Sequence, residues 1–186
     1  MKFSGIRMMS IDMLGLSQIY LNADKIASVS EWFDPHCMEN FSPLPVHDFG
    51  NNVYTLTDGH TRAYVAYKSG VRVLPVSYDN DVVAGEAGQM LYRADLDWCR
   101  RLGLSHIKQL GNRILNDSAY QKLWIRRCDR SYNLLTKASW AERNKLQKSV
   151  PDLFLYGASE DKSTLYFEDM AGRLFFFKDS ILLPET

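Results

Sequence analysis

The segment 44–76 constrains the fold of this chain more than any other stretch. Residues 44–57 alternate like two strands of a hairpin, and residues 60–69 repeat small and apolar side chains at helical spacing. Residues 73–79 return as a strand. We expect this strand to run parallel to the one before the helix, because crossover connections are right-handed. The segment therefore predicts an α+β fold in which a strand reaches a helix N-terminus through a tight Asp58-Gly59 turn.

A small polar cluster stands where this helix begins, in the run Asp58-Gly59-His60-Thr61-Arg62. The first backbone N–H groups of a helix have no partner within the helix, and the helix dipole adds a partial positive charge there. These groups attract anions, and a guanidinium matches the geometry of phosphate. The run therefore predicts a binding site for a phosphate, a phosphorylated small molecule or a nucleotide, with Arg62 as its cation.

Each residue of the cluster also has a structural interpretation. His60 either donates to a phosphate and carries protons or only hydrogen-bonds locally at the helix start. Arg62 either grips phosphate or forms a salt bridge to Asp58 or Asp48. Thr61 adds a hydroxyl to the site or serves as a cap. Asp58 holds the turn, orients Arg62 or binds a metal.

The pattern resembles the ParB/sulfiredoxin-like superfamily over residues 15–82. The glycine, an arginine and the Pro-Val strand of ParB proteins correspond to Gly59, Arg62 and Leu74-Pro75-Val76. Asp58-Gly59-His60-x-Arg62 is similar to the Asp-Gly-His-His-Arg signature of free serine kinases. His60 occupies the position of the sulfiredoxin cysteine, so peroxiredoxin repair is not expected.

This resemblance implies a ParB-like mixed sheet with helices and a nucleotide ligand, which would be ATP, ADP or CTP with magnesium. It also implies phosphoryl transfer, for which superfamily kinases use a catalytic glutamate before the hairpin. Glu31 and Glu39 are the candidates in this chain, with His60 as a third catalytic candidate. The alternative is that both glutamates are ordinary surface residues.

The net charge of the chain is zero but unevenly distributed. Residues 91–150 hold 13 Lys and Arg against 5 Asp and Glu, a net +8, while the segments on either side carry −4 each. Such a block either docks against its own acidic flanks or binds an acidic partner. The second case would make the protein a non-catalytic adaptor for DNA or RNA. The arginines that would contact phosphates are Arg100, Arg101, Arg126, Arg127 and Arg130.

Periodicity divides the chain after residue 82. We predict a ParB/sulfiredoxin-like domain at 1–82 and, at 83–186, a helical segment closed by an antiparallel β-meander. The expected helices cover 90–102, 107–114, 118–132 and 141–148. The expected strands of the meander cover 153–157, 164–167 and 174–177.

Composition limits the remaining classes. The chain is 46% apolar and 24% charged, as in ordinary globular proteins, and it has neither a signal-peptide core nor an apolar run of membrane-spanning length. We therefore expect a cytoplasmic protein without a membrane partner, while its oligomeric state stays open.

The cysteines and histidines predict neither disulfides nor a metal site. Cys37, Cys99 and Cys128 are odd in number and widely spaced, so reduced thiols are expected. His36, Cys37 and His47 lack any recognised metal-ligand spacing.

Overall fold

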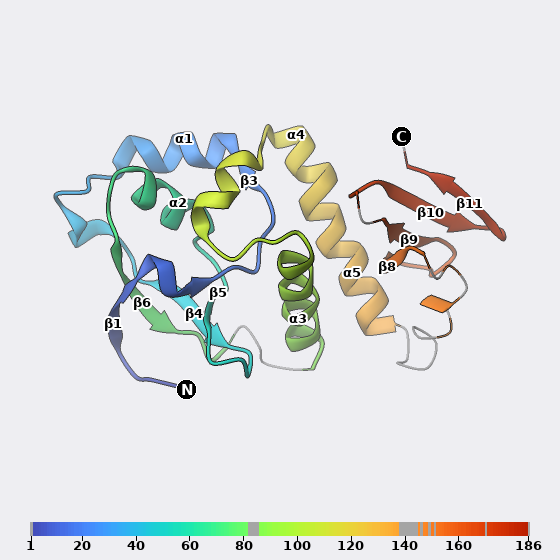
Figure 1. Cartoon of the computed structure of the whole chain (residues 1–186), viewed down its shortest axis with the longest axis horizontal. Coiled ribbons are helices and arrows are strands. Elements are labelled where there is room, and N and C mark those ends of the chain that lie inside the picture. Colours follow the sequence, from blue (N-terminus) through green and yellow to red (C-terminus); the bar gives the residue numbers. More distant parts are fainter. Residues whose placement is uncertain are drawn as a thin grey trace. The chain divides into compact units, whose positions relative to one another are not determined.

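A computed structural model of the chain describes residues 2–81, 86–137, 145, 147–148, 150, 152–169 and 171–185. The chain divides into two compact units, Met1–Gln121 (unit 1) and Lys122–Thr186 (unit 2) (Figure 1). Both contain helices and a sheet, which confirms the predicted α+β class. The domain boundary predicted at residue 82 falls inside unit 1, next to residues that are not described.

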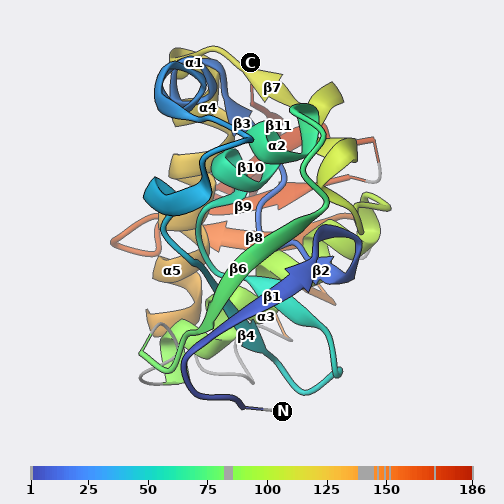
Figure 2. The same cartoon turned by 90° about the vertical axis from the view of Figure 1, so that its left-hand side faces the viewer.

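Unit 1 is built on a mixed five-stranded sheet with the strand order β1-β6-β4-β5-β2 (Figure 2). Its strands are β1 (Ile6–Ser10), β2 (Leu14–Gly15), β4 (Leu44–Asp48), β5 (Tyr54–Leu56) and β6 (Val73–Tyr78). One face of the sheet is closed by fully buried Leu44, Val46, Leu56, Leu74 and Val76. The predicted hairpin and returning strand are therefore present.

The direction of β6 differs from the prediction. β6 pairs in parallel with β4, and β4 pairs antiparallel with β5, so β6 runs opposite to the strand that precedes the helix. The parallel relation that we expected with β5 is thus found with β4. The hairpin places β4 between β5 and β6, so helix α2 (His60–Lys68) connects two oppositely directed strands that are not neighbours.

The helices of unit 1 are α1 (Ala23–Trp32), α2 (His60–Lys68), α3 (Glu86–Arg101) and α4 (Asp117–Tyr120). In the described part of unit 1, short 3₁₀ helices lie before α1 at Ile11–Met13, between α1 and α2 at Met38–Asn40, and between α3 and α4 at Ile107–Asn112. The side chain of Asn22 accepts from the N–H groups of Asp24 and Lys25 and so caps α1. Helix α1 therefore begins directly after the short strand β3 (Leu21–Asn22), which pairs in parallel with β7 (Ile114–Leu115).

Unit 2 packs one long helix against an antiparallel sheet. A π-helical turn, Gln121–Ile125, leads into α5 (Arg126–Lys137). The sheet has the order β11-β10-β9-β8, which confirms the predicted C-terminal meander. Its strands are β8 (Phe154–Ala158), β9 (Leu165–Glu168), β10 (Leu174–Lys178) and β11 (Ile181–Pro184). Most of the helix predicted at 141–148 lies outside the described residues.

A glycine sets the distance between α5 and the sheet. A Cβ atom at Gly157 in β8 would lie 2.5 Å from the Cβ of Arg130 and 2.9 Å from its carbonyl carbon. The helix backbone therefore rests directly on the strand. Beside this contact, Leu134, Ala158, Leu165 and Phe167 form the buried apolar core of unit 2.

The structure bears on two further expectations, which concern the cysteines and membrane-spanning helices. Cys37, Cys99 and Cys128 are free thiols, as predicted. Among the described residues, no helix is both long and apolar enough to cross a bilayer.

Candidate functional site

Gly59 fixes the start of α2. It is the N-cap residue and adopts a left-handed conformation with φ +78°. A Cβ atom there would lie 2.6 Å from Cδ2 of Leu44 and 2.9 Å from Nη2 of Arg62. Backbone conformation and space therefore both require glycine at this position.

The backbone of the first turn of α2 leaves donors available. The first helical bond runs from the Ala63 N–H to the Gly59 carbonyl, at 2.9 Å. The N–H groups of His60, Thr61 and Arg62 precede that bond, and the N-cap residue Gly59 has no side chain with which to cap them. The helix start predicted at this position is therefore present, and anion binding there stays a prediction.

Replacing Gly59 by alanine should destabilise the protein by about 2 kcal/mol, since the left-handed conformation alone costs about 1–2 kcal/mol for an L-residue and the clash adds to it. Urea unfolding measures the loss. Gly70→Ala is the matched control, because Gly70 also has positive φ (+88°) but a Cβ there would meet nothing within 4 Å. Equal losses in the two variants would contradict a steric role for Gly59.

Arg62 is held by the backbone rather than by a carboxylate. Its Nη1 donates to the Ser42 carbonyl at 2.7 Å, and its guanidinium lies 5.8 Å from the centre of the Phe41 ring. The carboxylate of Asp58 is 4.0 Å from Nη2 and largely exposed. Asp48 accepts instead from the Gly50 and Asn52 N–H groups of its own hairpin turn. Within the described part of the chain, this bond to Ser42 is the hydrogen bond that Arg62 makes.

A cavity of about 560 Å³ opens beside Arg62. The residues that line it are Trp32 at the end of α1, Asn40, Ser42 and Arg62. Trp32 leaves 45% of its surface exposed and lies against Phe33 and Phe41. The lining residues thus include a cation, an aromatic residue and two polar residues.

His60 is buried and connects two segments. Its Nε2 accepts from the Ser17 N–H at 3.1 Å, and the Ser17 hydroxyl donates to the Leu56 carbonyl at 2.7 Å. Burial lowers the pKa of His60 to about 4, against the opposing charge of Asp58. The ring is therefore neutral at pH 7 and ties the residues before β3 to the start of α2. Its predicted role as a proton carrier stays a prediction.

The remaining predicted residues lie around the cavity to different extents. Thr61 is partly buried in the first turn of α2, and Asp58 is exposed just before it. Glu31 and Glu39 are exposed and each is followed in the sequence by a lining residue, Trp32 or Asn40. Neither glutamate lines the cavity. Each stays a candidate because the residue next to it does.

Sequence reasoning missed Trp32, Asn40 and Ser42. The segment between α1 and β4 carries no periodic pattern, because it contains Pro35 and a single 3₁₀ turn. The one available signal was the density of aromatic residues at 32–41, which is unusual for an exposed connection.

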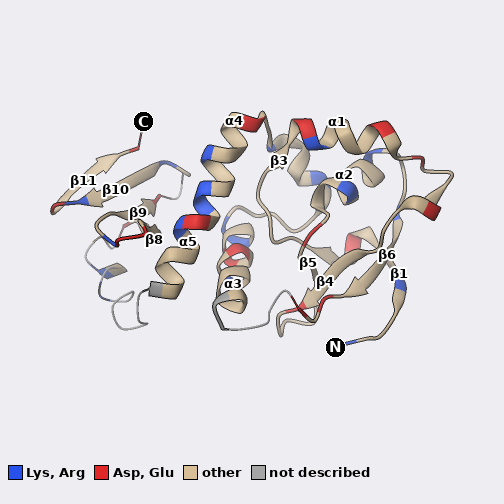
Figure 3. Cartoon of the chain, turned by 180° about the vertical axis from the view of Figure 1, so that it is seen from behind, with Lys and Arg blue, Asp and Glu red and all other residues tan. Residues whose placement is uncertain are grey.

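The basic residues of unit 2 are partly committed to its own fold. Arg127 forms a buried ion pair with Glu168 at 2.9 Å. Arg130 makes a bidentate pair with Glu185 and lies 3.7 Å from the centre of the Tyr166 ring. Figure 3 shows these basic positions gathered in the N-terminal half of α5. Arg127 and Arg130 therefore pair with acidic residues of the same chain, which is the first of the two alternatives for the basic block.

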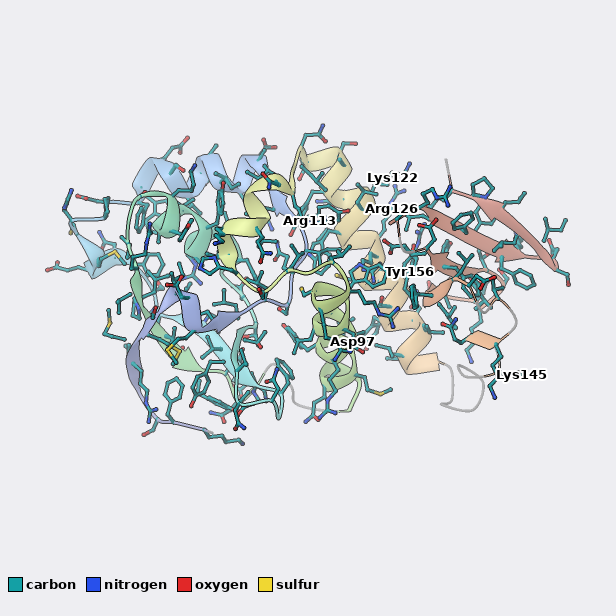
Figure 4. All side chains as sticks on the ribbon, in the orientation of Figure 1. Asp97, Arg113, Lys122, Arg126, Lys145 and Tyr156 are labelled. Carbon is teal, nitrogen blue, oxygen red and sulfur yellow. The ribbon has the colours of Figure 1, made fainter. Side chains whose placement is uncertain are left out.

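The other predicted arginines are exposed. Arg100 pairs with Asp97 on α3 at 2.7 Å, and Arg101 lies 6.0 Å from the centre of the Trp98 ring. Arg126 extends outward from α5, one helical turn after Lys122 (Figure 4). These three arginines are the ones whose side chains reach solvent.

No protein-family model matches the chain, and no curated protein matches it. Among the described residues, no group of three or more His, Cys, Asp or Glu is placed to hold a metal ion.

Proposed function

We propose that unit 1 binds a phosphate-bearing small molecule, with a nucleotide such as ATP, ADP or CTP as the leading candidate. The observation that carries this proposal is the Arg62 guanidinium, which is fixed by the Ser42 carbonyl in the wall of a cavity at the first turn of α2. The similarity of Asp58-Gly59-His60-x-Arg62 to ParB/sulfiredoxin-like signatures supports the same site.

The parts of a nucleotide would divide between two sides of the cavity. Arg62, which lines the cavity, suits the phosphates because a guanidinium supplies donors to an anion. The exposed Trp32 ring suits the base, since every base has a π-face that stacks on an aromatic side chain. The described lining residues include no carboxylate, so magnesium would arrive bound to the phosphates.

Phosphoryl transfer is the extension of this proposal that rests on the resemblance alone. It requires a base near the acceptor hydroxyl, and Glu31 and Glu39 are the candidates. Free serine is the acceptor that the resemblance suggests. Formation of phosphoserine and ADP from serine and ATP, compared between the wild type and the Glu31→Gln and Glu39→Gln variants, tests this step separately from binding.

Replacing Arg62 by alanine should weaken nucleotide binding about tenfold to a hundredfold, because a charge-assisted bond is worth roughly 1.5–3 kcal/mol. Calorimetric titration with ADP, ATP and CTP measures the affinities. Arg72→Ala is the matched control: Arg72 is another partly exposed cation of unit 1, bonded to the Tyr67 and Val71 carbonyls.

The melting temperature separates the possible outcomes. We expect the melting temperature of Arg62→Ala to be close to that of the wild type. We expect Arg72→Ala to bind nucleotides with the affinity of the wild type. Equal affinity in the wild type and Arg62→Ala would refute the site. A collapsed melting temperature in Arg62→Ala would identify Arg62 as a structural residue.

The alternative proposal, a DNA- or RNA-associated adaptor, now draws on Arg100, Arg101 and Arg126. Binding through phosphate contacts weakens steeply with salt, with a slope near −0.9 per contact on duplex DNA. Mobility shifts at two salt concentrations decide it. Absence of retardation at low salt would remove this alternative.

A further inference from the structure

A second cavity of unit 1 opens beside strand β2. Its volume is about 1090 Å³, and its lining comes from β2 and the residues that flank it, from the β4–β5 hairpin and from α3. In the described chain, β2 ends the sheet order β1-β6-β4-β5-β2, so it has one paired edge, toward β5, and one outer edge. The lining residues of this cavity and of the cavity at Arg62 do not overlap. A function of this second cavity is therefore independent of the nucleotide proposal.

The outer edge of β2 carries two backbone groups that have no hydrogen-bond partner in the described chain. The Leu14 N–H donates to the Ile11 carbonyl, so Leu14 points away from β5 and the next residue, Gly15, makes the bonds to β5. The Leu14 carbonyl and the Leu16 N–H therefore lie on the outer edge. Leu14 and Leu16 are only 2% and 4% exposed, and both line the cavity. Buried backbone groups are almost always hydrogen-bonded, and the cavity is the side from which a partner can reach these two.

The spacing of these two groups suits an extended peptide. One residue of a strand parallel to β2 bonds to both, because its N–H and its carbonyl point to the same side. The cavity, at about 1090 Å³, also exceeds the roughly 300–1,000 Å³ of small-molecule pockets. Strand addition to a sheet edge needs, besides such bonds, contacts for the side chains of the added strand. Phe49, Tyr54 and Leu96 line the cavity and provide apolar surface for them.

One charged residue of the lining is available to a ligand. Arg100 pairs with Asp97 at 2.7 Å, and Asp12 is bonded to the His106 ring. Arg93, which is exposed, makes no hydrogen bond or ion pair with any residue that the structure describes. It lies on α3, one helical turn before the Asp97 that Figure 4 labels. A carboxylate is therefore the group that this side of the cavity favours in a peptide.

We propose that this cavity binds an extended peptide, which adds to β2 as a parallel strand and places an acidic side chain against Arg93. The peptide backbone donates to the Leu14 carbonyl and accepts from the Leu16 N–H. Its apolar side chains pack against Phe49 and Leu96, which adds to the affinity. Two backbone hydrogen bonds and one exposed ion pair make a small contact, so the complex is weak and reversible.

A display library of random heptapeptides, selected on the whole chain, provides the probe. Enriched peptides should carry an aspartate or glutamate among alternating apolar residues. The most enriched one is synthesised with a fluorescent label, and its anisotropy is measured as the protein is added. A library that yields no peptide with a higher affinity for this protein than for an unrelated control protein would overturn the proposal.

Charge reversal tests the role of Arg93. Arg93→Glu should weaken binding of the selected peptide at least about fivefold, because attraction to its carboxylate becomes repulsion. The same variant should prefer a version of the peptide in which lysine replaces the acidic residue. Lys68→Glu is the matched control, at an exposed cation of unit 1 outside the cavity lining, and should bind both peptides like the wild type. The proposal fails if Arg93→Glu and the wild type rank the two peptides alike.

Amide exchange tests the strand pairing itself. Exchange of the Leu16 N–H, followed by NMR, should slow about tenfold when the peptide fills about nine-tenths of the sites, because exchange then proceeds from the remaining free protein. The Gly15 N–H, which bonds to β5 in the free protein, is the control and should change less. An unchanged Leu16 rate in the saturated complex would show that the peptide does not pair with β2, which contradicts the proposal.

Discussion

Replacing Arg127 by methionine should destabilise unit 2 by about 3–5 kcal/mol, because the change leaves the Glu168 carboxylate buried without its cation. Both side chains of the pair are only 9% exposed, and Nη1 of Arg127 lies 2.9 Å from the carboxylate. The guanidinium also lies 4.6 Å from the centre of the Tyr156 ring. Hydrogen exchange of peptides from β8 to β10 in urea measures the loss within unit 2.

Two further variants show whether charge or packing is responsible. Arg127→Met combined with Glu168→Leu should lose less than the sum of the single changes, because no unpaired charge remains buried. Arg100→Met should cost less than about 1 kcal/mol, since its pair with Asp97 is exposed. A double variant as unstable as the sum would show that the packing of these side chains, rather than their charges, holds the sheet to α5.

Acidification should destabilise unit 1 through His60. The folded pKa of about 4 lies below the ordinary value of 6.5, so the unfolded chain binds a proton more readily than the folded one. This contribution to stability is fully present above pH 6.5 and is lost as the pH falls from 6.5 to 4. The shift corresponds to roughly 3 kcal/mol over that range.

His60→Gln isolates this effect, because glutamine retains an acceptor for the Ser17 N–H but does not titrate. Urea unfolding of unit 1 at pH 7, 5.5 and 4.5 compares the two proteins. The wild type should lose stability between pH 6.5 and 4 by more than the variant does. Parallel pH curves would show that His60 is solvated or protonated in the folded protein.

The central segment was predictable because its signals are local. The hairpin at 44–57 and the helix at 60–69 correspond to β4, β5 and α2 (His60–Lys68) within a few residues. Alternation, turn residues and helical spacing act within about ten residues, and Gly59 and Gly70 mark both ends of the helix. The place of Arg62 near a helix N-terminus follows from the same signals.

The lining of the cavity and strand β11 were not predictable in this way. Trp32 and Ser42 line one cavity with Arg62, which follows them by 30 and 20 residues, and no local pattern records this contact. β11 depends on Asp179 and Ser180 both adopting positive φ, at 51° and 65°, where glycine or asparagine is the usual signal. The partners of Arg127 and Arg130 lie 41 and 55 residues away.

The pairing of β3 with β7 joins two segments that are synthesised far apart in time. Leu21 in β3 is paired with Ile114, which the ribosome adds 93 residues later. At about 5–20 residues per second, this interval lasts on the order of 5–20 s. During this time Leu21, which the finished protein buries completely, lacks its strand partner. The β3–β7 pair can therefore form only after residues 114 and 115 have been added to the chain.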